Sequence, residues 1–96
     1  TAFFAENDYM AIGMLRALQG KGIKVPDDVS IIGFDNIDMC KFVSPSITSI
    51  DVPKHKIAET CVTQLMKMFT DDSFIDIKQF VAVTIVERQS TKKAEL

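Results

Sequence analysis

The stretch Val29 to Asn36, which reads Val-Ser-Ile-Ile-Gly-Phe-Asp-Asn, decides the predicted fold because a short apolar run ends in it abruptly at an acid. The run has almost no polar alternation, which is typical of a parallel strand covered by helices on both faces. In open α/β sheets, ligands bind in the crevice at the carboxyl ends of the strands. Asp35, the first residue past the last apolar position, is therefore the first candidate ligand-binding residue.

The composition indicates one globular domain or less. The chain has 96 residues, 47% of them apolar, and a formal net charge of −2. No segment gathers the basic residues that phosphate contacts need, so this stretch by itself is not expected to bind nucleic acid. No apolar run is long enough to span a bilayer, and no membrane partner is expected. Cys40 and Cys61 have no metal-like spacing and are predicted to be buried, reduced thiols, which fits a reducing compartment.

The first half of the chain predicts a strand, a helix and a strand. Residues 1–5 form the first strand, Asn7 or Asp8 caps a helix that runs to Gln19, and the strand that begins at Val29 follows. A right-handed parallel unit of this kind makes Asn7 and Asp35 neighbours at one sheet edge. A carboxylate and an amide that converge there suit a polyhydroxylated ligand, and this is binding rather than catalytic chemistry. The alternative is that both residues are only caps at strand-to-helix turns.

The predicted first helix has two distinct faces. One is an apolar stripe of Met10, Ala11, Met14, Leu15 and Leu18. Tyr9, Ile12 and Arg16 fall on the side away from it, and an apolar residue beside a Tyr and an Arg is the composition of a protein interface. The alternative is a single exposed isoleucine, which is common on protein surfaces.

The second half continues with shorter elements and one long helix. The predicted order is a short helix or turn at 36–43, a strand at 47–52, an amphipathic helix at 54–69, a loop at 70–73, an ambiguous segment at 74–78, a strand at 80–86 and a polar tail from 87 whose end is frayed. The long helix carries a wide apolar stripe of Ile57, Ala58, Cys61, Val62, Leu65, Met68 and Phe69. Such a stripe needs a partner surface.

The residues offer little for catalysis. An enzyme needs a nucleophile beside a base, paired acids or a ligand cluster, and the sequence shows none of these patterns. His55 stands beside two lysines at the start of the long helix, where a solvated histidine is expected. The glycines form neither a phosphate loop nor a dinucleotide fingerprint, so no cofactor and no metal are expected.

Four segments together resemble a known family. They are residues 5–13 (Ala-Glu-Asn-Asp-Tyr-Met-Ala-Ile-Gly), residues 25–36 (Val-Pro-Asp-Asp-Val-Ser-Ile-Ile-Gly-Phe-Asp-Asn), residues 44–50 (Ser-Pro-Ser-Ile-Thr-Ser-Ile) and residues 86–91 (Val-Glu-Arg-Gln-Ser-Thr). In this order and spacing they look like the carboxyl-terminal part of the LacI/GalR family of bacterial transcriptional regulators. The match spans nearly the whole chain.

The resemblance implies a fragment of a two-lobed, periplasmic-binding-protein-like (type I) α/β sensor domain, without the amino-terminal helix-turn-helix domain. Residues 1–50 would belong to the carboxyl-terminal lobe, residues 51–85 would cross the hinge and supply a helix and a strand to the amino-terminal lobe, and residues 86–96 would be the return strand and tail. Such regulators are cytoplasmic repressors, homodimers or higher oligomers, and they contact DNA only through the domain that is absent here.

The resemblance also implies residue roles. In the family, the residues that correspond to Asn7 and Asp35 hydrogen-bond a small effector, usually a sugar or another metabolite, whose binding shifts the two lobes. The helix after Asn7 takes part in dimerisation, in agreement with the face of Tyr9, Ile12 and Arg16. Glu6 and the segment Asp51-Val52-Pro53 depart from the family pattern, which leaves the effector open.

Two other functions remain open from the sequence. The nearest is an exported sugar-binding protein of a transporter, which shares the fold and would differ by a signal peptide in place of a helix-turn-helix. The other is a small α/β enzyme, whose turnover would depend on Asp35 or His55.

Overall fold

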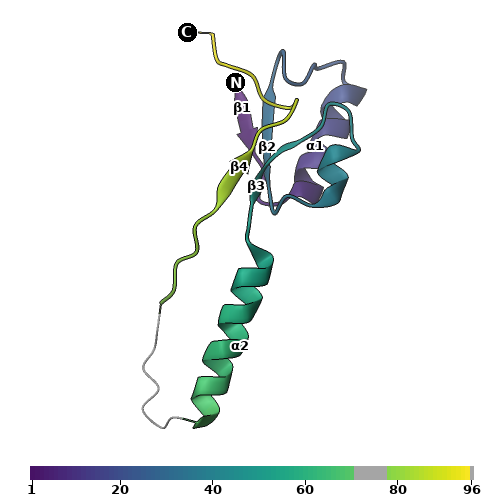
Figure 1. Cartoon of the computed structure of the whole chain (residues 1–96). Coiled ribbons are helices and arrows are strands. Elements are labelled where there is room, and N and C mark those ends of the chain that lie inside the picture. Colours follow the sequence, from purple (N-terminus) through teal and green to yellow (C-terminus); the bar gives the residue numbers. More distant parts are fainter. Residues whose placement is uncertain (71–77, 96) are drawn as a thin grey trace. The chain divides into compact units, whose positions relative to one another are not determined.

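The computed structural model describes residues 1–70 and 78–95, and its internal contacts divide the chain into two units. Unit 1 comprises Thr1–Val52 and Thr84–Leu96, and unit 2 comprises Pro53–Val83. The elements are β1 (Ala2–Phe4), α1 (Asp8–Gly20), β2 (Ser30–Phe34), a 3-10 helix η1 (Asp38–Lys41), β3 (Thr48–Asp51), α2 (Lys54–Thr70) and β4 (Thr84–Val86), as Figure 1 shows. Neither α1 nor α2 is long and apolar enough to cross a membrane.

Unit 1 is built on a four-stranded sheet in the order β1-β2-β3-β4. β2 pairs in parallel with β1 and with β3, whereas β4 runs antiparallel to β3. α1 connects β1 to β2, so the predicted α/β class and the strand-helix-strand order are confirmed. Because β1 and β2 are parallel neighbours, Asn7 and Asp35 follow them at the same edge of the sheet.

The core of unit 1 lies between α1 and one face of the sheet. Its buried apolar residues are Ala5, Ala11, Leu15, Ile31, Cys40 and Ile47. Burial alternates along β2, where Ile31 and Gly33 are buried and Ser30, Ile32 and Phe34 are half-buried. The prediction that this strand is covered on both faces is therefore wrong for the described chain, because α1 covers only the face to which Ile31 and Gly33 point.

Aromatic side chains mark the opposite face of the sheet. Phe4 of β1 and Phe34 of β2 pack edge to face, with ring centroids 6.4 Å apart and an interplanar angle of 81°. Phe4 is nevertheless 63% exposed. The apolar composition of β2 thus supplies both the core of unit 1 and an apolar surface on its other side.

The buried face of α1 is rotated from the predicted stripe. Asp8, Ala11 and Leu15 are its buried residues, whereas Met10, which the prediction placed on the stripe, is 52% exposed. The prediction used apolar residues alone, and the buried carboxylate of Asp8 displaces the centre of the inward face. As a result, Ile12 is half-buried and packs against the core.

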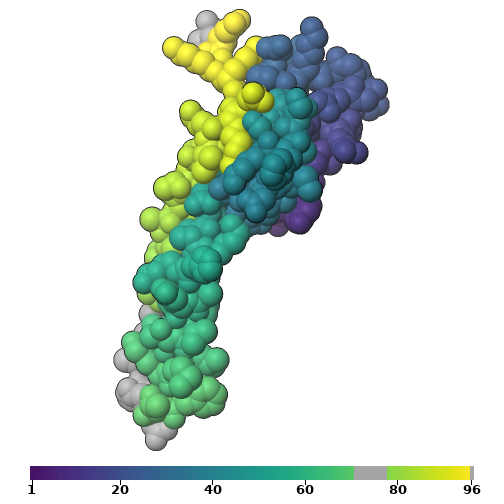
Figure 2. Space-filling view, turned by 45° about the vertical axis from the view of Figure 1, so that its right-hand side comes forward, coloured from purple at the N-terminus to yellow at the C-terminus, as the bar shows by residue number. Residues whose placement is uncertain are grey.

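The segment after β4 is anchored rather than being the predicted polar tail. Ile31 N donates to Ser90 O at 2.9 Å, while Ser90 Oγ donates to Ile31 O at 2.6 Å and accepts from Thr48 N at 2.8 Å. Ser90 therefore bridges β2 and β3 at the start of their paired region, where Thr48 is opposite Ile32. Its hydroxyl can donate and accept at once, which is why a polar residue is fully buried here. Figure 2 shows this yellow segment against the surface of unit 1.

Unit 2 consists of α2 and the described residues that precede β4. The predicted helix is confirmed, but none of its residues is buried. On the predicted apolar stripe, Val62 is 60% exposed, Leu65 51% and Phe69 78%. Cys61 is also exposed, so the expectation of two buried thiols holds only for Cys40.

Two predictions in this region differ from the structure or lie outside it. The predicted strand at 80–86 is shorter, because β4 pairs only where it faces β3, from Thr84 to Val86. Most of the predicted loop at 70–73 and of the ambiguous segment at 74–78 lies outside the described residues.

Candidate functional site

Asn7 stands between β1 and α1 and caps the helix. Its backbone is extended, with φ −150° and ψ 169°, and its Oδ1 accepts a hydrogen bond from Met10 N at 2.9 Å. The capping alternative raised by the sequence is therefore correct for the oxygen of this amide. The cap does not use the Nδ2 group, a donor, so one side chain can cap α1 and donate to a ligand.

Asp35 and Asn36 form the turn that follows β2, and both have positive φ angles, 103° and 52° respectively. Such backbone conformations cost about 1–3 kcal/mol for residues with a side chain, although Asn and Asp tolerate them better than most. They persist only where the surrounding structure holds them. The Asp35 side chain therefore projects from an unusual backbone conformation at the carboxyl end of the central strand.

Three successive backbone N–H groups hold this turn in place. Asp35 N donates to Ile50 O at 3.0 Å, Asn36 N donates to Ser49 Oγ at 3.0 Å, and Ile37 N donates to Asp8 Oδ2 at 2.8 Å. The acceptors come from β3 and from the first residue of α1. The backbone at Asp35 is thus held by β3, next to β2 in the sheet, and by the first residue of α1.

Asp8 is the buried centre of this arrangement. The residue is 0% exposed, and its second oxygen accepts from Ser49 Oγ at 2.6 Å. Burial, together with the hydrogen bond and the negative charge of Asp8, raises the pKa of the Cys40 thiol to about 11. A buried carboxylate with several donors is tolerated because each hydrogen bond to a charged group offsets part of its desolvation. Asp8 therefore ties together α1, the turn, η1 and β3.

From the sequence, Asp8 was a candidate only for the cap of α1. A signal was available, because Asp8, Ala11 and Leu15 have the i, i+3, i+7 spacing of one helix face. An acid on the core face of an apolar stripe indicates a buried carboxylate with partners. Those partners lie far along the chain, and the spacing alone does not identify them.

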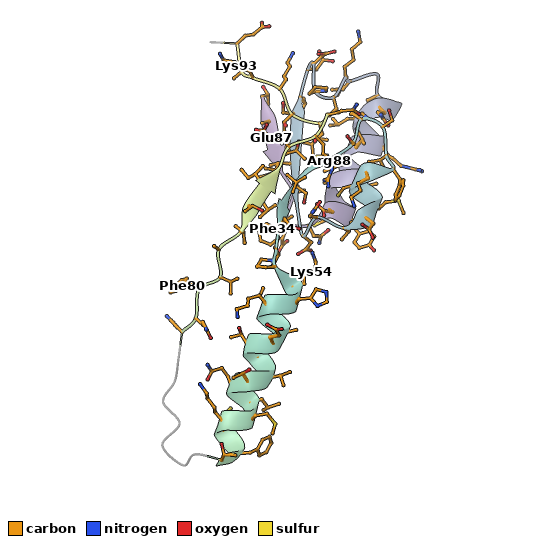
Figure 3. All side chains as sticks on the ribbon, in the orientation of Figure 1. Phe34, Lys54, Phe80, Glu87, Arg88 and Lys93 are labelled. Carbon is orange, nitrogen blue, oxygen red and sulfur yellow. The ribbon has the colours of Figure 1, made fainter. Side chains whose placement is uncertain are left out.

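The role of Asn36 in joining distant segments was also not predicted from the sequence. Its Nδ2 donates to Asp51 Oδ1 at 2.8 Å, and its Oδ1 accepts from Arg88 Nη2 at 2.6 Å. Arg88 lies on the segment that follows β4 (Figure 3), where its Nη1 also donates to Ile47 O at 2.7 Å. Asn36, which follows Asp35, is thus bonded to Asp51, shortly before the chain enters unit 2, and to Arg88, shortly after it leaves unit 2.

The three residues predicted at a dimer interface are placed differently from one another. Tyr9 is 73% exposed, and Arg16 is also exposed. Ile12 is half-buried against the core, so the expectation that it lies away from the core is wrong. The accessible part of this face is formed by Tyr9 and Arg16, with the edge of Ile12 between them.

The described residues hold no group of three or more His, Cys, Asp or Glu side chains placed to bind a metal ion. His55 is exposed at the start of α2. The candidate site offers the carboxylate of Asp35, on a backbone held by hydrogen bonds, and the amide donor of Asn7 at one sheet edge. These groups are suited to hydrogen-bonding the hydroxyls of a small ligand.

Comparison with known proteins decides the family. A sequence model of the periplasmic binding protein-like domain matches residues 1–91. The chain belongs to this family. Among curated relatives, the periplasmic binding protein-like chain is 44% identical over 91 residues to the HTH-type transcriptional regulator MalR of Clostridium butyricum, covering 94% of this chain and 27% of the relative. The chain therefore spans about a quarter of the length of that regulator.

Solved structures agree with this assignment. The periplasmic binding protein-like chain matches a LacI family transcriptional regulator of Enterococcus faecalis, solved with bound ribose, with a TM-score of 0.85 and 41% identity, covering 95% of this chain and 34% of that one. It also matches the lac repressor dimer bound to operator and the anti-inducer ONPF, with a TM-score of 0.86 and 28% identity, covering 95% and 32%.

These findings confirm the resemblance to LacI/GalR regulators that the four sequence segments carried. The relatives named here are transcriptional regulators, not enzymes, which agrees with the prediction of a binding protein.

Proposed function

We propose that this chain is the effector-sensing part of a LacI-type transcriptional repressor, and that Asn7 and Asp35 bind the polar groups of a small effector, a sugar or a related metabolite. The observation that carries the proposal is the turn at Asp35, where three successive N–H groups are bonded to β3 and to Asp8. A carboxylate on a backbone that is held in advance binds a ligand at a lower ordering cost. Its place at the carboxyl edge of the parallel strands is where α/β folds bind ligands.

The two side chains have complementary roles. The Asp35 carboxylate accepts hydrogen bonds from two ligand hydroxyls, and Asn7 Nδ2 donates to a ligand oxygen while Oδ1 keeps its bond to Met10 N. A sugar is favoured because its adjacent hydroxyls match a bidentate carboxylate. The ribose bound to the Enterococcus faecalis relative supports the same class of ligand.

The effector acts, in this proposal, by shifting the orientation of two lobes. Unit 1 is part of the carboxyl-terminal lobe, and the helix and segment of unit 2 belong to the amino-terminal lobe of the full-length protein. A ligand that contacts both lobes favours their closed arrangement by its difference in affinity for the two states. A helix-turn-helix domain outside this chain converts that shift into a change of operator affinity.

The proposed assembly is a cytoplasmic homodimer or higher oligomer. The face of Tyr9, Ile12 and Arg16 on α1 forms part of the contact between copies. The lac repressor dimer on its operator supports this arrangement by analogy of fold. DNA is contacted only by the separate helix-turn-helix domain, since this chain has a net charge of −2 and no segment of its sequence gathers basic residues.

Calorimetry on the full-length protein tests the site. D-ribose and a panel of aldoses and disaccharides are titrated into the wild type to select the sugar that binds, and the variants are measured with it. A hydrogen bond to a charged group contributes about 1.5–3 kcal/mol, so Asp35→Ala is expected to weaken binding by roughly tenfold to a hundredfold, and Asn7→Ala by less. Asp35→Asn, which keeps the shape and tolerates the positive φ angle, gives the same result without a change in folding.

The matched control is Asp38→Ala, since the Asp38 side chain is 89% exposed and lies three residues beyond Asp35. This variant is expected to bind as the wild type does. Unchanged affinity in a folded Asp35→Asn variant removes Asp35 from the site. If no sugar of the panel binds, the sugar class is wrong. If the bound sugar leaves the affinity for operator DNA unchanged, the regulatory role is wrong.

A further inference from the structure

Asn36 joins three separate segments of unit 1. Its side chain lies between the carboxylate of Asp51, 2.8 Å from Nδ2, and the guanidinium of Arg88, 2.6 Å from Oδ1. Its backbone N–H donates to Ser49 Oγ at 3.0 Å. Asn36 and Arg88 are 52 positions apart in the sequence, so this contact is set by the tertiary structure alone.

The chemistry of the two partners determines which side chain fits between them. A guanidinium only donates hydrogen bonds, and an ionised carboxylate only accepts them. An amide satisfies both, with its oxygen toward Arg88 and its nitrogen toward Asp51. An aspartate at position 36 would keep the contact with Arg88 and place a second carboxylate against Asp51. Asparagine also tolerates the φ angle of 52° better than most residues.

The two partners lie where the chain passes between the units. Asp51 is the last residue of β3, shortly before unit 2 begins at Pro53. The chain returns at Thr84, and Thr84 pairs with Asp51 in the antiparallel register of β3 and β4. Arg88 follows two residues after β4 and is fixed further by Ile47 O and by the bond from its own N–H to Thr48 Oγ1.

We propose that Asn36 is a positioning residue that joins the turn carrying Asp35 to both strands through which the chain passes between the units. As a clamp, the amide holds Asp51, at the end of β3, and Arg88, which follows β4 in the sequence. A displacement of the turn by ligand is therefore transmitted to both strands together. This inference rests on the proposed function for the role of Asp35 as a ligand-binding residue, but the clamp itself is a property of the ligand-free chain.

Hydrogen exchange on the full-length protein without ligand tests the clamp directly. In Asn36→Asp, the new carboxylate repels Asp51, and amide exchange is expected to rise about tenfold or more around residues 50–52 and 84–86, beyond any uniform change. The double variant Asn36→Asp with Asp51→Asn restores a donor opposite an acceptor. With the carboxylate and the amide swapped, the amides of both segments are expected to be as protected from hydrogen exchange as in the wild type.

The rescue separates positioning from a general loss of stability. Asp38→Asn, which removes a carboxylate charge as Asp51→Asn does but from an exposed side chain, is the control and is expected to change neither segment. An increase in exchange that is uniform over unit 1, or a double variant that adds the two single effects without rescue, overturns the clamp.

A sugar titration links the clamp to the site. With D-ribose as the probe, Asn36→Asp is expected to lower the affinity about tenfold, and the double variant is expected to restore it, because Asp35 itself is unchanged. An altered exchange pattern together with an unchanged ribose affinity overturns the transmission to the site. If D-ribose does not bind the wild type, that result counts against ribose as the effector in the proposed function, while the exchange pattern still decides the clamp.

Discussion

Gly33 of β2 lies directly against the carboxylate of Asp8. A Cβ atom placed on Gly33 would overlap Asp8 Oδ1 and would touch Ala11 Cβ at 3.4 Å. Asp8 cannot easily retreat, because its two oxygens are bonded to Ser49 Oγ and to Ile37 N. The central strand therefore needs a glycine two residues before Asp35, so that the buried carboxylate can hold the turn.

The first prediction concerns Gly33→Ala. The extra methyl group must displace the Asp8 carboxylate or the backbone, and we expect a loss of about 2–4 kcal/mol in the free energy of unfolding from overpacking and broken hydrogen bonds. Chemical denaturation of the full-length protein measures this. Gly13→Ala is the control, since nothing lies within 4 Å of that position in α1. It is expected to stabilise the helix by about 0.5–1 kcal/mol. A neutral Gly33→Ala would contradict the tight contact.

The second prediction concerns the two cysteines. Cys40 is buried and its pKa is raised to about 11, whereas Cys61 is exposed. Iodoacetamide at pH 8 is expected to alkylate Cys61 in the Leu65→Lys variant of the 96-residue chain, in which the stripe of α2 stays uncovered, and to leave Cys40 unmodified until denaturant is added, because the thiolate is the reactive form. Mass spectrometry of the digested protein measures this. Cys61→Ser should remove the fast reaction, and rapid labelling of Cys40 would show that its site is open.

The same thiol predicts a dependence of stability on pH. The folded pKa lies above the ordinary value of 9.0, so folding favours the neutral thiol. Its contribution is fully present below pH 9, and it is lost as the pH rises from 9 to about 11, because the unfolded chain ionises first. Cys40→Ala should flatten the dependence in this range. If the denaturation midpoints of the wild type and of Cys40→Ala change by the same amount over this pH range, the raised pKa is contradicted.

Another prediction concerns the proposed dimer contact on α1. Tyr9→Asp and Arg16→Glu alter exposed side chains without touching the core, and each is expected to dissociate the full-length dimer by placing an unpaired charge in the contact. Sedimentation equilibrium measures the loss. Ala17→Glu, elsewhere on the exposed surface of α1, is the control. Ile12→Asp is expected to unfold the protein as well, since Ile12 packs on the core. An undisturbed dimer in both charge variants would exclude this face.

A final prediction concerns the exposed stripe of α2. Exposure costs about 25 cal/mol for each Å² of apolar surface, and seven side chains amount to roughly 10 kcal/mol, as much as the whole stability of a small domain. The isolated 96-residue chain is therefore expected to fold α2 back onto its own sheet or, more favourably, to exchange it with a second copy through the extended residues 49–53. Light scattering should detect a dimer or a larger species.

Leu65→Lys tests this association, because Leu65 lies on the stripe and is 51% exposed. It should weaken the association, whereas Thr63→Lys, which adds the same charge on the other face of α2, should not. A well-folded monomer whose mass and stability are unchanged by Leu65→Lys would mean that the stripe is never buried.

The sequence by itself determined the elements and the two site candidates. The apolar period of residues 8–20 and 54–70 specifies helices, and the caps and the β-branched runs specify where the strands lie. The rule that ligands bind at the carboxyl ends of parallel strands then selects Asn7 and Asp35. The four quoted segments, in their order and spacing, were sufficient to identify the family.

Only the tertiary structure decided how those candidates are held. Asp8 turns inward to bond Ser49, Asn36 lies between Asp51 and Arg88, and Ser90 bridges β2 and β3. A periodic pattern indicates which face of one element is apolar, but it contains no information about which distant residue satisfies a buried polar group. These contacts join residues 15 to 59 positions apart, and each is fixed by the requirement that a buried donor or acceptor find a partner.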